Sequence, residues 1–324
     1  MGELIILPSG KKVGHDWTID HKLGAGSFGA VYRCSNSKGE IFALKVEGAN
    51  EKIQLLKMEL YVLTELNKSG GRHFCRVEDK GRMENFIYVV MTLVGRSLQD
   101  LRLAASMKKF SLGTAIGVGI QCLEALEDLH SIGYLHRDVK PGNYSIGRAE
   151  LHELRKIYVL DFGMCRKFIH DDGTIKKPRA AASFRGTVKY APVACHLQRE
   201  LCRLDDCETW LYMLVEITKG SLPWRNLRQL FGGCPREYID LMRLIDGGKF
   251  FDEPKYGIMY SILRKALNNL GVQEFPYDWE EEEERRLEES RAMDMITRNA
   301  EEKKEERERK ERKAKEEEEE RVRF

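Results

Sequence analysis

The chain has 324 residues, of which 42% are hydrophobic and 33% are charged, and its formal net charge is +2. This length exceeds one average domain and allows a sizeable hydrophobic core. The eight cysteines include no C-x-x-C pair, which argues against a zinc site and predicts reduced thiols in an intracellular compartment. The apolar run at residues 4–7 is too short for a signal peptide or a membrane segment, so we expect no membrane association.

The charges are unevenly distributed along the chain. Residues 280–324 carry 19 acidic and 14 basic side chains, a net of −5, whereas residues 1–279 carry 33 acidic and 40 basic ones, a net of +7. A basic body favours acidic partners, either phosphates or acidic peptides, although solubility alone explains the same balance.

Residues 1–16 are predicted to form a short leader, and a strand pattern begins at Trp17. Gly24, Gly26 and Gly29 follow at the spacing G-x-G-x-x-G, and a second strand pattern comes directly after them. In dinucleotide-binding folds this glycine motif opens a helix. A glycine loop between two strands is instead typical of a loop whose backbone amides cover nucleotide phosphates. A glycine-rich hairpin without a ligand is the alternative.

A lysine on the next strand and a glutamate on the next helix have the spacing of an ion pair. Lys45 lies in the strand pattern at residues 41–47, where apolar neighbours leave it in need of a partner. Glu59 follows among apolar residues at helical spacing over residues 55–63. We expect Glu59 to hold Lys45 on the α- and β-phosphates of a nucleotide. The alternative for Glu59 is a position on a solvated helix face.

The apolar strand pattern at residues 86–91 runs into residues 92–95, which we interpret as a hinge between two lobes. Met91 would border an adenine pocket, and Val94 would offer backbone hydrogen bonds to adenine. Beyond the hinge, apolar residues recur at helical spacing over residues 114–130. Strands before the hinge and helices after it favour an α+β fold with two segregated lobes over an alternating doubly wound sheet.

The stretch His136–Asn143 combines three groups that phosphoryl transfer requires. Asp138 can accept a proton from a hydroxyl, Lys140 places a cation beside the moving phosphate, and Asn143 offers an amide ligand for Mg²⁺. Asp161 begins an Asp-Phe-Gly triplet and offers a second metal ligand. A polar turn between a helix and a strand is the alternative. Both motifs in this order and at this separation make chance a poor explanation.

The hydrophilic segment between Asp161 and Pro192 lacks a strong periodic pattern, which is usual for a functional or a disordered loop. In a protein kinase this segment would be the activation loop followed by the peptide-docking loop, with Thr187 near enough to bridge the base Asp138 and Lys140. Asp206 lies in a later helical pattern and is predicted to be a buried acid that braces the catalytic loop. A carboxylate favoured by the helix dipole is compatible with that role.

With these residues in place, the chain resembles the casein kinase 1 group of eukaryotic protein kinases over residues 17–279, and it is most similar to the tau-tubulin kinase branch. Besides the catalytic motifs, the resemblance rests on Leu56–Glu59, Tyr88–Met91, Gly95–Leu98, Phe184–Ala191 and Leu222–Arg225. Val193 stands where most kinases have a glutamate, but this group lacks that glutamate too. Gly142 replaces a common Asp or Ser, from which we expect a local effect only.

The resemblance implies a two-lobed protein kinase fold, with a small β-rich N-lobe at residues 17–91, the hinge at 92–95 and a larger, mainly helical C-lobe at 96–279. It implies a serine/threonine kinase that uses ATP and Mg²⁺, with Asn143 and Asp161 as metal ligands. The implied ATP-binding residues are Leu23, Gly24, Gly26, Gly29, Val31, Ala43, Lys45, Glu59, Met91 and Val94.

The same group is known for substrates that are acidic or already phosphorylated upstream of the target hydroxyl. Its anion pocket corresponds here to Lys189 and Arg228, with Arg185 nearby. Converging ammonium and guanidinium groups would bind a substrate phosphate strongly. The alternative is that these residues pair with loop carboxylates or with a phosphorylated loop residue.

Residues 280–324 are rich in Glu, Lys and Arg and have too few apolar residues for a coiled-coil seam. We expect a solvated helix or a disordered tail, with binding of other proteins as a second role, and a monomeric chain.

The expected partners are protein substrates rather than nucleic acids, because the basic body carries no recognised nucleic-acid motif. The expected location is intracellular, in the cytoplasm and also the nucleus. The rival hypothesis is a pseudokinase scaffold that acts through protein–protein interaction. Five intact residues count against it: Lys45, Glu59, Asp138, Asn143 and Asp161.

Overall fold

The computed structural model describes residues 5–26, 29–51, 54–224 and 230–323, with side chains described as far as residue 311. The chain divides into two compact units, Met1–Asp278 and Trp279–Phe324.

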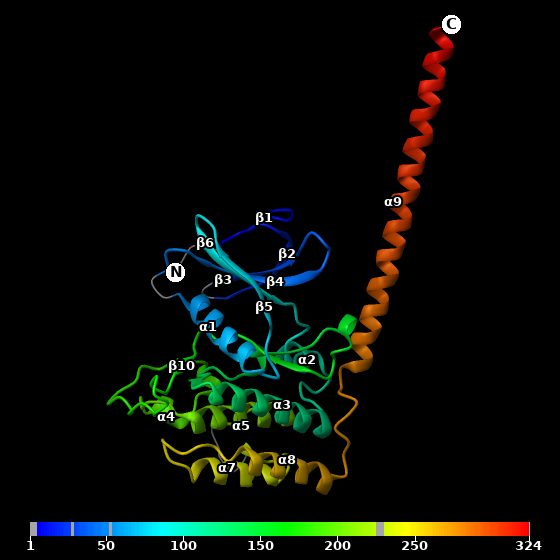
Figure 1. Cartoon of the computed structure of the whole chain (residues 1–324). Coiled ribbons are helices and arrows are strands. Elements are labelled where there is room, and N and C mark those ends of the chain that lie inside the picture. Colours follow the sequence, from blue (N-terminus) through cyan, green and yellow to red (C-terminus); the bar gives the residue numbers. More distant parts are fainter. Residues whose placement is uncertain (1–4, 27–28, 52–53, 225–229, 324) are drawn as a thin grey trace. The chain divides into compact units, whose positions relative to one another are not determined.

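The first part of the larger unit is an antiparallel sheet with one helix, α1 (Leu55–Lys68), beside it (Figure 1). Its strand order is β1-β2-β3-β4-β6-β5. Strands that follow one another in the sequence are paired, except that β4 pairs with β6 and β5 lies at the outer edge beside β6. The strands are β1 (Lys12–Val13), β2 (Trp17–Gly26), β3 (Gly29–Ser35), β4 (Ile41–Gly48), β5 (Val77–Arg82) and β6 (Phe86–Thr92).

The segment predicted to be a leader contributes to this sheet. Val13 of β1 pairs with Trp17 of β2, and both are buried in one apolar cluster with Leu7. The described part of this segment is therefore built into the N-lobe, which differs from the expected leader. A proline and a glycine separate its few apolar residues, so the sequence shows no strand pattern there.

The second part of the larger unit is mainly helical, as Figure 1 shows. Its helices are α2 (Leu98–Ala104), α3 (Leu112–Ser131), α4 (Val193–His196), α5 (Arg203–Lys219), α7 (Glu237–Asp246) and α8 (Tyr256–Leu270). Short strands and 3-10 turns lie between them: β7 (Tyr134–Leu135), η1 (Pro141–Asn143), β8 (Tyr144–Ile146), η2 (Ala149–Leu151), β9 (Ile157–Val159), β10 (Arg166–Lys167) and η3 (Val188–Tyr190).

Helices α3 and α5 pack closely at the centre of this lobe. The indole nitrogen of Trp210 on α5 donates to the main-chain oxygen of Gly119 on α3, at 2.9 Å. A Cβ at Gly119 would lie 2.8 Å from Leu214, so the glycine permits this approach. Serine caps fix where α2 and α3 begin, because Ser97 accepts from the amide of Asp100 and Ser111 from that of Thr114. The catalytic loop follows directly on α3 and so starts from a fixed point.

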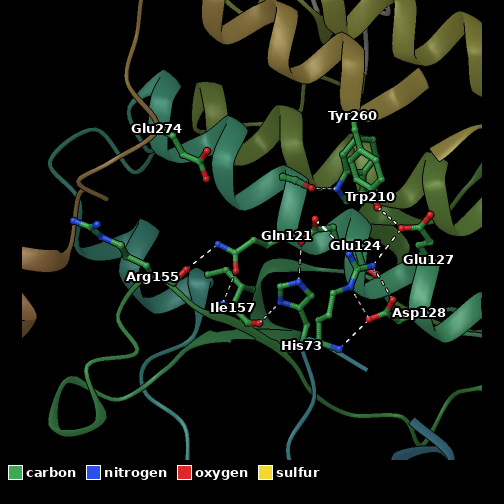
Figure 2. Close-up of polar contacts among 12 residues, drawn as sticks. His73, Gln121, Glu124, Glu127, Asp128, Arg155, Ile157, Trp210, Tyr260 and Glu274 are labelled. Carbon is green, nitrogen blue, oxygen red and sulfur yellow. Dashed lines mark hydrogen bonds and ion pairs between the residues drawn. The ribbon is translucent and has the colours of Figure 1, made fainter. Parts of the chain in front are cut away.

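The segment after α1 is bound to α3 by charged side chains (Figure 2). His73 is buried, with Nδ1 2.9 Å from the main-chain oxygen of Ile157 and Nε2 3.0 Å from the carboxylate of Glu124. The guanidinium of Arg72 binds both carboxylate oxygens of Asp128, at 2.7 and 3.1 Å. These bonds anchor the C-terminal end of α1 to the helical lobe.

The larger unit thus has the predicted α+β fold, with a β-rich N-lobe and a larger helical C-lobe. The smaller unit is one helix, α9 (Glu280–Arg323). Its described side chains form i,i+4 ion pairs, such as Glu306–Lys310 at 2.6 Å. Among the described residues, every helix is too short or too polar to cross a membrane.

Candidate active site

A cavity of about 730 Å³ lies between the two lobes and collects most of the predicted nucleotide-binding residues. The hinge strand and its continuation contribute Met91 and Val94, and the catalytic loop contributes Asp138. The predicted ATP-binding residues that line it are Leu23, Gly29, Val31, Ala43, Lys45, Glu59, Met91 and Val94. Gly24 and Gly26 are not among the lining residues that the structure describes.

The glycine motif joins two paired strands, as the sequence predicts. Gly26 ends β2 and pairs with Gly29 at the start of β3. A Cβ at Gly29 would overlap the main-chain oxygen of Val46 on β4, so only glycine fits the close approach of the two strands there. The tip of the loop, Ser27–Phe28, lies outside the described residues.

Lys45 and Glu59 form the predicted ion pair, with Nζ 2.5 Å from Oε2. Nζ of Lys45 also lies 3.6 Å from the carboxylate of Asp161. Burial alone would lower the pKa of Lys45, but the two carboxylates outweigh it and raise this pKa above its ordinary value. The lysine therefore remains a cation facing the cavity.

The carboxylate of Asp138 in the catalytic loop accepts hydrogen bonds from neighbouring side chains. Oδ2 of Asp138 accepts from Nζ of Lys140 at 2.6 Å, and Oδ1 accepts from the hydroxyl of Thr187 at 2.7 Å. Nζ of Lys140 also donates to that hydroxyl at 3.1 Å, which confirms the predicted bridge between the docking loop, the base and the lysine. Asn143 donates its Nδ2 to the main-chain oxygen of Asp138 at 2.8 Å and so holds the loop closed.

Asp206 braces this loop from α5, as predicted. Its buried carboxylate accepts from the amides of His136 at 2.7 Å and Arg137 at 2.9 Å, and from Nε2 of His130 at 2.9 Å. Burial tends to raise the pKa of Asp206, but these hydrogen bonds and the nearby histidines outweigh burial and lower it. An ionised carboxylate beneath the loop fixes the backbone that carries Asp138.

Comparison with known proteins matches residues 17–231 to the protein kinase domain. This chain belongs to the protein kinase family. A Dictyostelium discoideum protein named "Probable serine/threonine-protein kinase" is 34% identical over 283 residues, which cover 82% of this chain and 56% of that protein. The serine/threonine-protein kinase spe-6 of Caenorhabditis elegans is 33% identical over 294 residues, which cover 83% of this chain and 76% of that protein.

The family and these names confirm the predicted fold and the predicted enzyme class, a protein serine/threonine kinase. The kinase chain spans little more than half the length of the Dictyostelium relative. Family membership also implies ATP and a divalent metal ion in general.

The residues predicted to hold the metal have a suitable donor set. Asp161 supplies a carboxylate whose side chain is 47% exposed. Burial tends to raise the pKa of that carboxyl, but nearby positive charges, with Lys45 foremost, and a backbone hydrogen bond from Gly163 together lower it below its ordinary value. Asn143 bonds to Asp138 through Nδ2, so its amide oxygen is the atom left for a cation. Carboxylate and amide oxygens are hard ligands of the kind that Mg²⁺ prefers. The backbone of Asp161 has φ +63°, an uncommon conformation typical of functional positions.

The predicted anion pocket is only partly described. The ammonium group of Lys189 contacts the buried carboxylate of Glu216, which also accepts from the hydroxyl of Tyr190 and lies 3.5 Å from Arg102. Lys189 thus has a carboxylate partner, but this partner belongs to helix α5 and not to a loop as the alternative expected, and the side chain of Lys189 is 44% exposed. Arg185 is exposed.

Arg228, the third predicted pocket residue, lies outside the described residues.

Glu47 is a functional residue that the sequence analysis missed. Its buried carboxylate accepts from the amides of Leu55 and Leu56, at 3.0 and 3.2 Å, and so caps the start of α1. Because α1 carries Glu59, this cap helps to place the partner of Lys45. An acidic residue shortly before a helical pattern is the signal that could have revealed it.

Proposed function

We propose that this chain transfers the γ-phosphate of ATP to serine or threonine side chains of acidic or phospho-primed proteins, as a member of the casein kinase 1 group near the tau-tubulin kinase branch. One arrangement carries the proposal. Asp138, Lys140 and Thr187 form a closed set of hydrogen bonds at a cavity that also holds Lys45 and Asp161.

Each side chain has a distinct task in this mechanism. Asp138 orients the substrate hydroxyl and accepts its proton, and Lys140 stabilises charge on the phosphoryl group in transfer. Lys45, held by Glu59, binds the α- and β-phosphates. Asp161 and Asn143 would hold Mg²⁺, which supplies neutralisation of the phosphate charge when bound.

Thr187 has a place in the substrate's approach. Its hydroxyl donates a hydrogen bond to one carboxylate oxygen of Asp138 and accepts one from Lys140. These two bonds fix the position of the docking loop relative to the base. A substrate hydroxyl that reaches Asp138 comes in beside Thr187, and the two compete for the same carboxylate. The docking loop therefore governs which peptides place a hydroxyl on the base.

The test of phosphoryl transfer compares the full chain with its Asp161→Asn variant, using radiolabelled ATP with casein and acidic peptides. We expect wild-type turnover and a loss of roughly three orders of magnitude in the variant, because its metal ligand has lost its charge. The half-exposed position of Asp161 predicts an unchanged melting temperature. Undiminished transfer by the variant would sink the mechanism, and nucleotide binding without transfer by the wild type would favour the scaffold hypothesis.

The substrate preference needs its own test. Charge reversal at Lys189 and Arg228 should reduce kcat/KM for phospho-primed peptides much more than for unprimed ones, because the proposed pocket acts only on the priming phosphate. Equal losses on both kinds of peptide would refute the pocket. A melting curve of each variant controls for the contact between Lys189 and Glu216.

The proposed location is inside the cell, where thiols stay reduced. All eight cysteines are free in the structure, and most of them are buried.

A further inference from the structure

A buried carboxylate outside the catalytic loop binds two arginines from separate segments. Glu200 lies between α4 and α5, with its side chain 7% exposed. Its Oε1 is 3.1 Å from Nε of Arg166 in β10 and 3.1 Å from Nη2 of Arg179 in the activation loop, and Nε of Arg179 contacts its Oε2. Arg179 therefore binds Glu200 through two nitrogens, the strongest geometry for this kind of pair.

A third arginine lies within the electrostatic reach of the same carboxylate. Arg137 of the catalytic loop has φ +67° and donates through Nε to the main-chain oxygen of Met164 at 2.8 Å. Burial and the charge of Arg166 lower the pKa of Arg137, whereas Asp206 and Glu200 act in the opposite direction. Glu200 is the anion that Arg166 and Arg179 share, and Arg137 lies in the adjoining catalytic loop.

The Glu200 contacts connect the activation loop to the catalytic loop. Arg166 pairs with Leu135 in the short sheet of β10 and β7, directly before the catalytic loop. The amide of Ala182 donates to the main-chain oxygen of Gln198 at 2.8 Å, which adds a second link beside Glu200. The docking loop that follows is bound to the catalytic loop, because the hydroxyl of Thr187 donates to the carboxylate of Asp138. The activation loop is therefore held at both ends.

In kinases with switchable loops, a phosphorylated loop side chain supplies the anion that orders the loop on an arginine cluster. We propose that Glu200 supplies this charge permanently and acts as a positioning residue, which holds the activation loop in its substrate-binding arrangement without phosphorylation. This inference rests on the proposed kinase function, because it concerns how the same site receives its substrate.

The first test uses the full chain, treated with a phosphatase and checked by intact mass. Glu200→Gln removes the charge with little change in shape. We expect kcat/KM for an acidic peptide to fall by about tenfold or more, with the KM for ATP unchanged, because Lys45 and Glu59 do not contact Glu200. Glu237→Gln is the matched control, since it neutralises another buried carboxylate, bound to Asn269 at 2.7 Å, far along the chain from the loop.

A second readout follows the loop itself. Limited trypsin digestion should cut the activation loop, at Lys176, Arg179 or Arg185, faster in Glu200→Gln than in the wild type and the control. Added formate should slow this cleavage and raise the activity of Glu200→Ala, because a free anion can enter the vacated place. Arg179→Gln should change the peptide kinetics in the same direction and is expected to fold, since this side chain is 47% exposed.

The following outcomes separate the hypotheses. The role of Glu200 would be overturned if Glu200→Gln had the same kcat/KM and the same resistance to trypsin as the wild type. It would also be overturned if the wild-type chain lost its activity on dephosphorylation. A wild-type chain that phosphorylates no test protein would overturn the proposed function. In that case faster cleavage of Glu200→Gln would still support the loop-holding role, and equal cleavage would refute it.

Discussion

The imidazole of His73 lies between two acceptors, with Nε2 3.0 Å from the carboxylate of Glu124 and Nδ1 2.9 Å from the main-chain oxygen of Ile157 (Figure 2). The oxygen of Ile157 can only accept, so Nδ1 carries a hydrogen and donates it to that oxygen. The hydrogen bond from His73 opposes the effect of burial and holds the pKa of Glu124 below its ordinary value of 4.5.

The hydrogen bond between His73 and Glu124 predicts a contribution to the free energy of unfolding that is lost at acid pH. The unfolded chain takes up the proton of Glu124 at a higher pH than the folded chain does, so the stabilisation is complete above pH 4.5 and is lost as pH falls through the lower folded pKa. Glu124→Gln should lower the free energy of unfolding at neutral pH by about 1–2 kcal/mol. Urea titrations at several pH values should show that the free energy of unfolding falls less steeply below pH 4.5 in the variant than in the wild type. Parallel pH profiles for the two proteins would contradict this contribution of Glu124.

The pair of Lys45 and Glu59 predicts a loss of nucleotide affinity without a loss of the fold. Glu59→Gln leaves Lys45 with Asp161 as its nearby carboxylate, so the ammonium moves toward the metal ligand and away from the phosphates. We expect kcat/KM for ATP to fall by roughly a hundredfold in steady-state kinetics.

The same helix offers a control for that variant. Glu65→Gln also removes an α1 carboxylate, but Glu65 binds Lys68, a side chain that is 68% exposed. Such surface pairs contribute little, so this variant should keep its kcat/KM for ATP. Similar losses in both variants would show that α1 as a whole, and not the Lys45 pair, is responsible.

The sequence was sufficient for the parts of the site whose residue types are unusual and whose spacing is local. Asp138, Lys140 and Asn143 share one loop, and Lys45 and Glu59 stand on adjacent elements, so short-range patterns predicted their contacts.

Other features could not be predicted because their signal is not local. Strand β5 alternates half-buried and exposed residues with hardly any apolar side chain, so no hydrophobic pattern marks it. Glu200 and Glu216 were missed for a different reason. Their partners, such as Arg166 and Arg102, lie far away in the sequence and meet them only after the lobe has packed.

The buried carboxylate of Glu216 predicts a large stability loss. It faces Arg102, whose side chain is 5% exposed and whose Nε is buried without a hydrogen-bond partner among the described residues. Glu216→Gln would leave that guanidinium with no charge to balance it, at a cost of about 3–5 kcal/mol in the free energy of unfolding. Denaturant titration measures this, and a change below about 1 kcal/mol, the size expected of a surface ion pair, would contradict it.

Gly186 predicts a loss of activity through the backbone. Its φ is +100°, and an added Cβ would lie 2.5 Å from the main-chain oxygen of Arg137, so alanine forces the docking loop away from the catalytic loop. The hydroxyl of Thr187, the next residue, would then leave Asp138. We expect Gly186→Ala to reduce kcat/KM for peptides by at least about tenfold, with a loss of roughly 1–3 kcal/mol in stability.

Gly142, a glycine within the catalytic loop itself, separates this backbone effect from a general intolerance of side chains near Asp138. An added Cβ at Gly142 would have no heavy atom within 4 Å, and the backbone there has no positive φ. Gly142→Ala should therefore keep its stability within about 0.5 kcal/mol and retain full activity. The measurement is kcat/KM for peptides in the two variants. Equal losses of kcat/KM would mean that loop entropy, and not the contact with Arg137, determines the position of the docking loop.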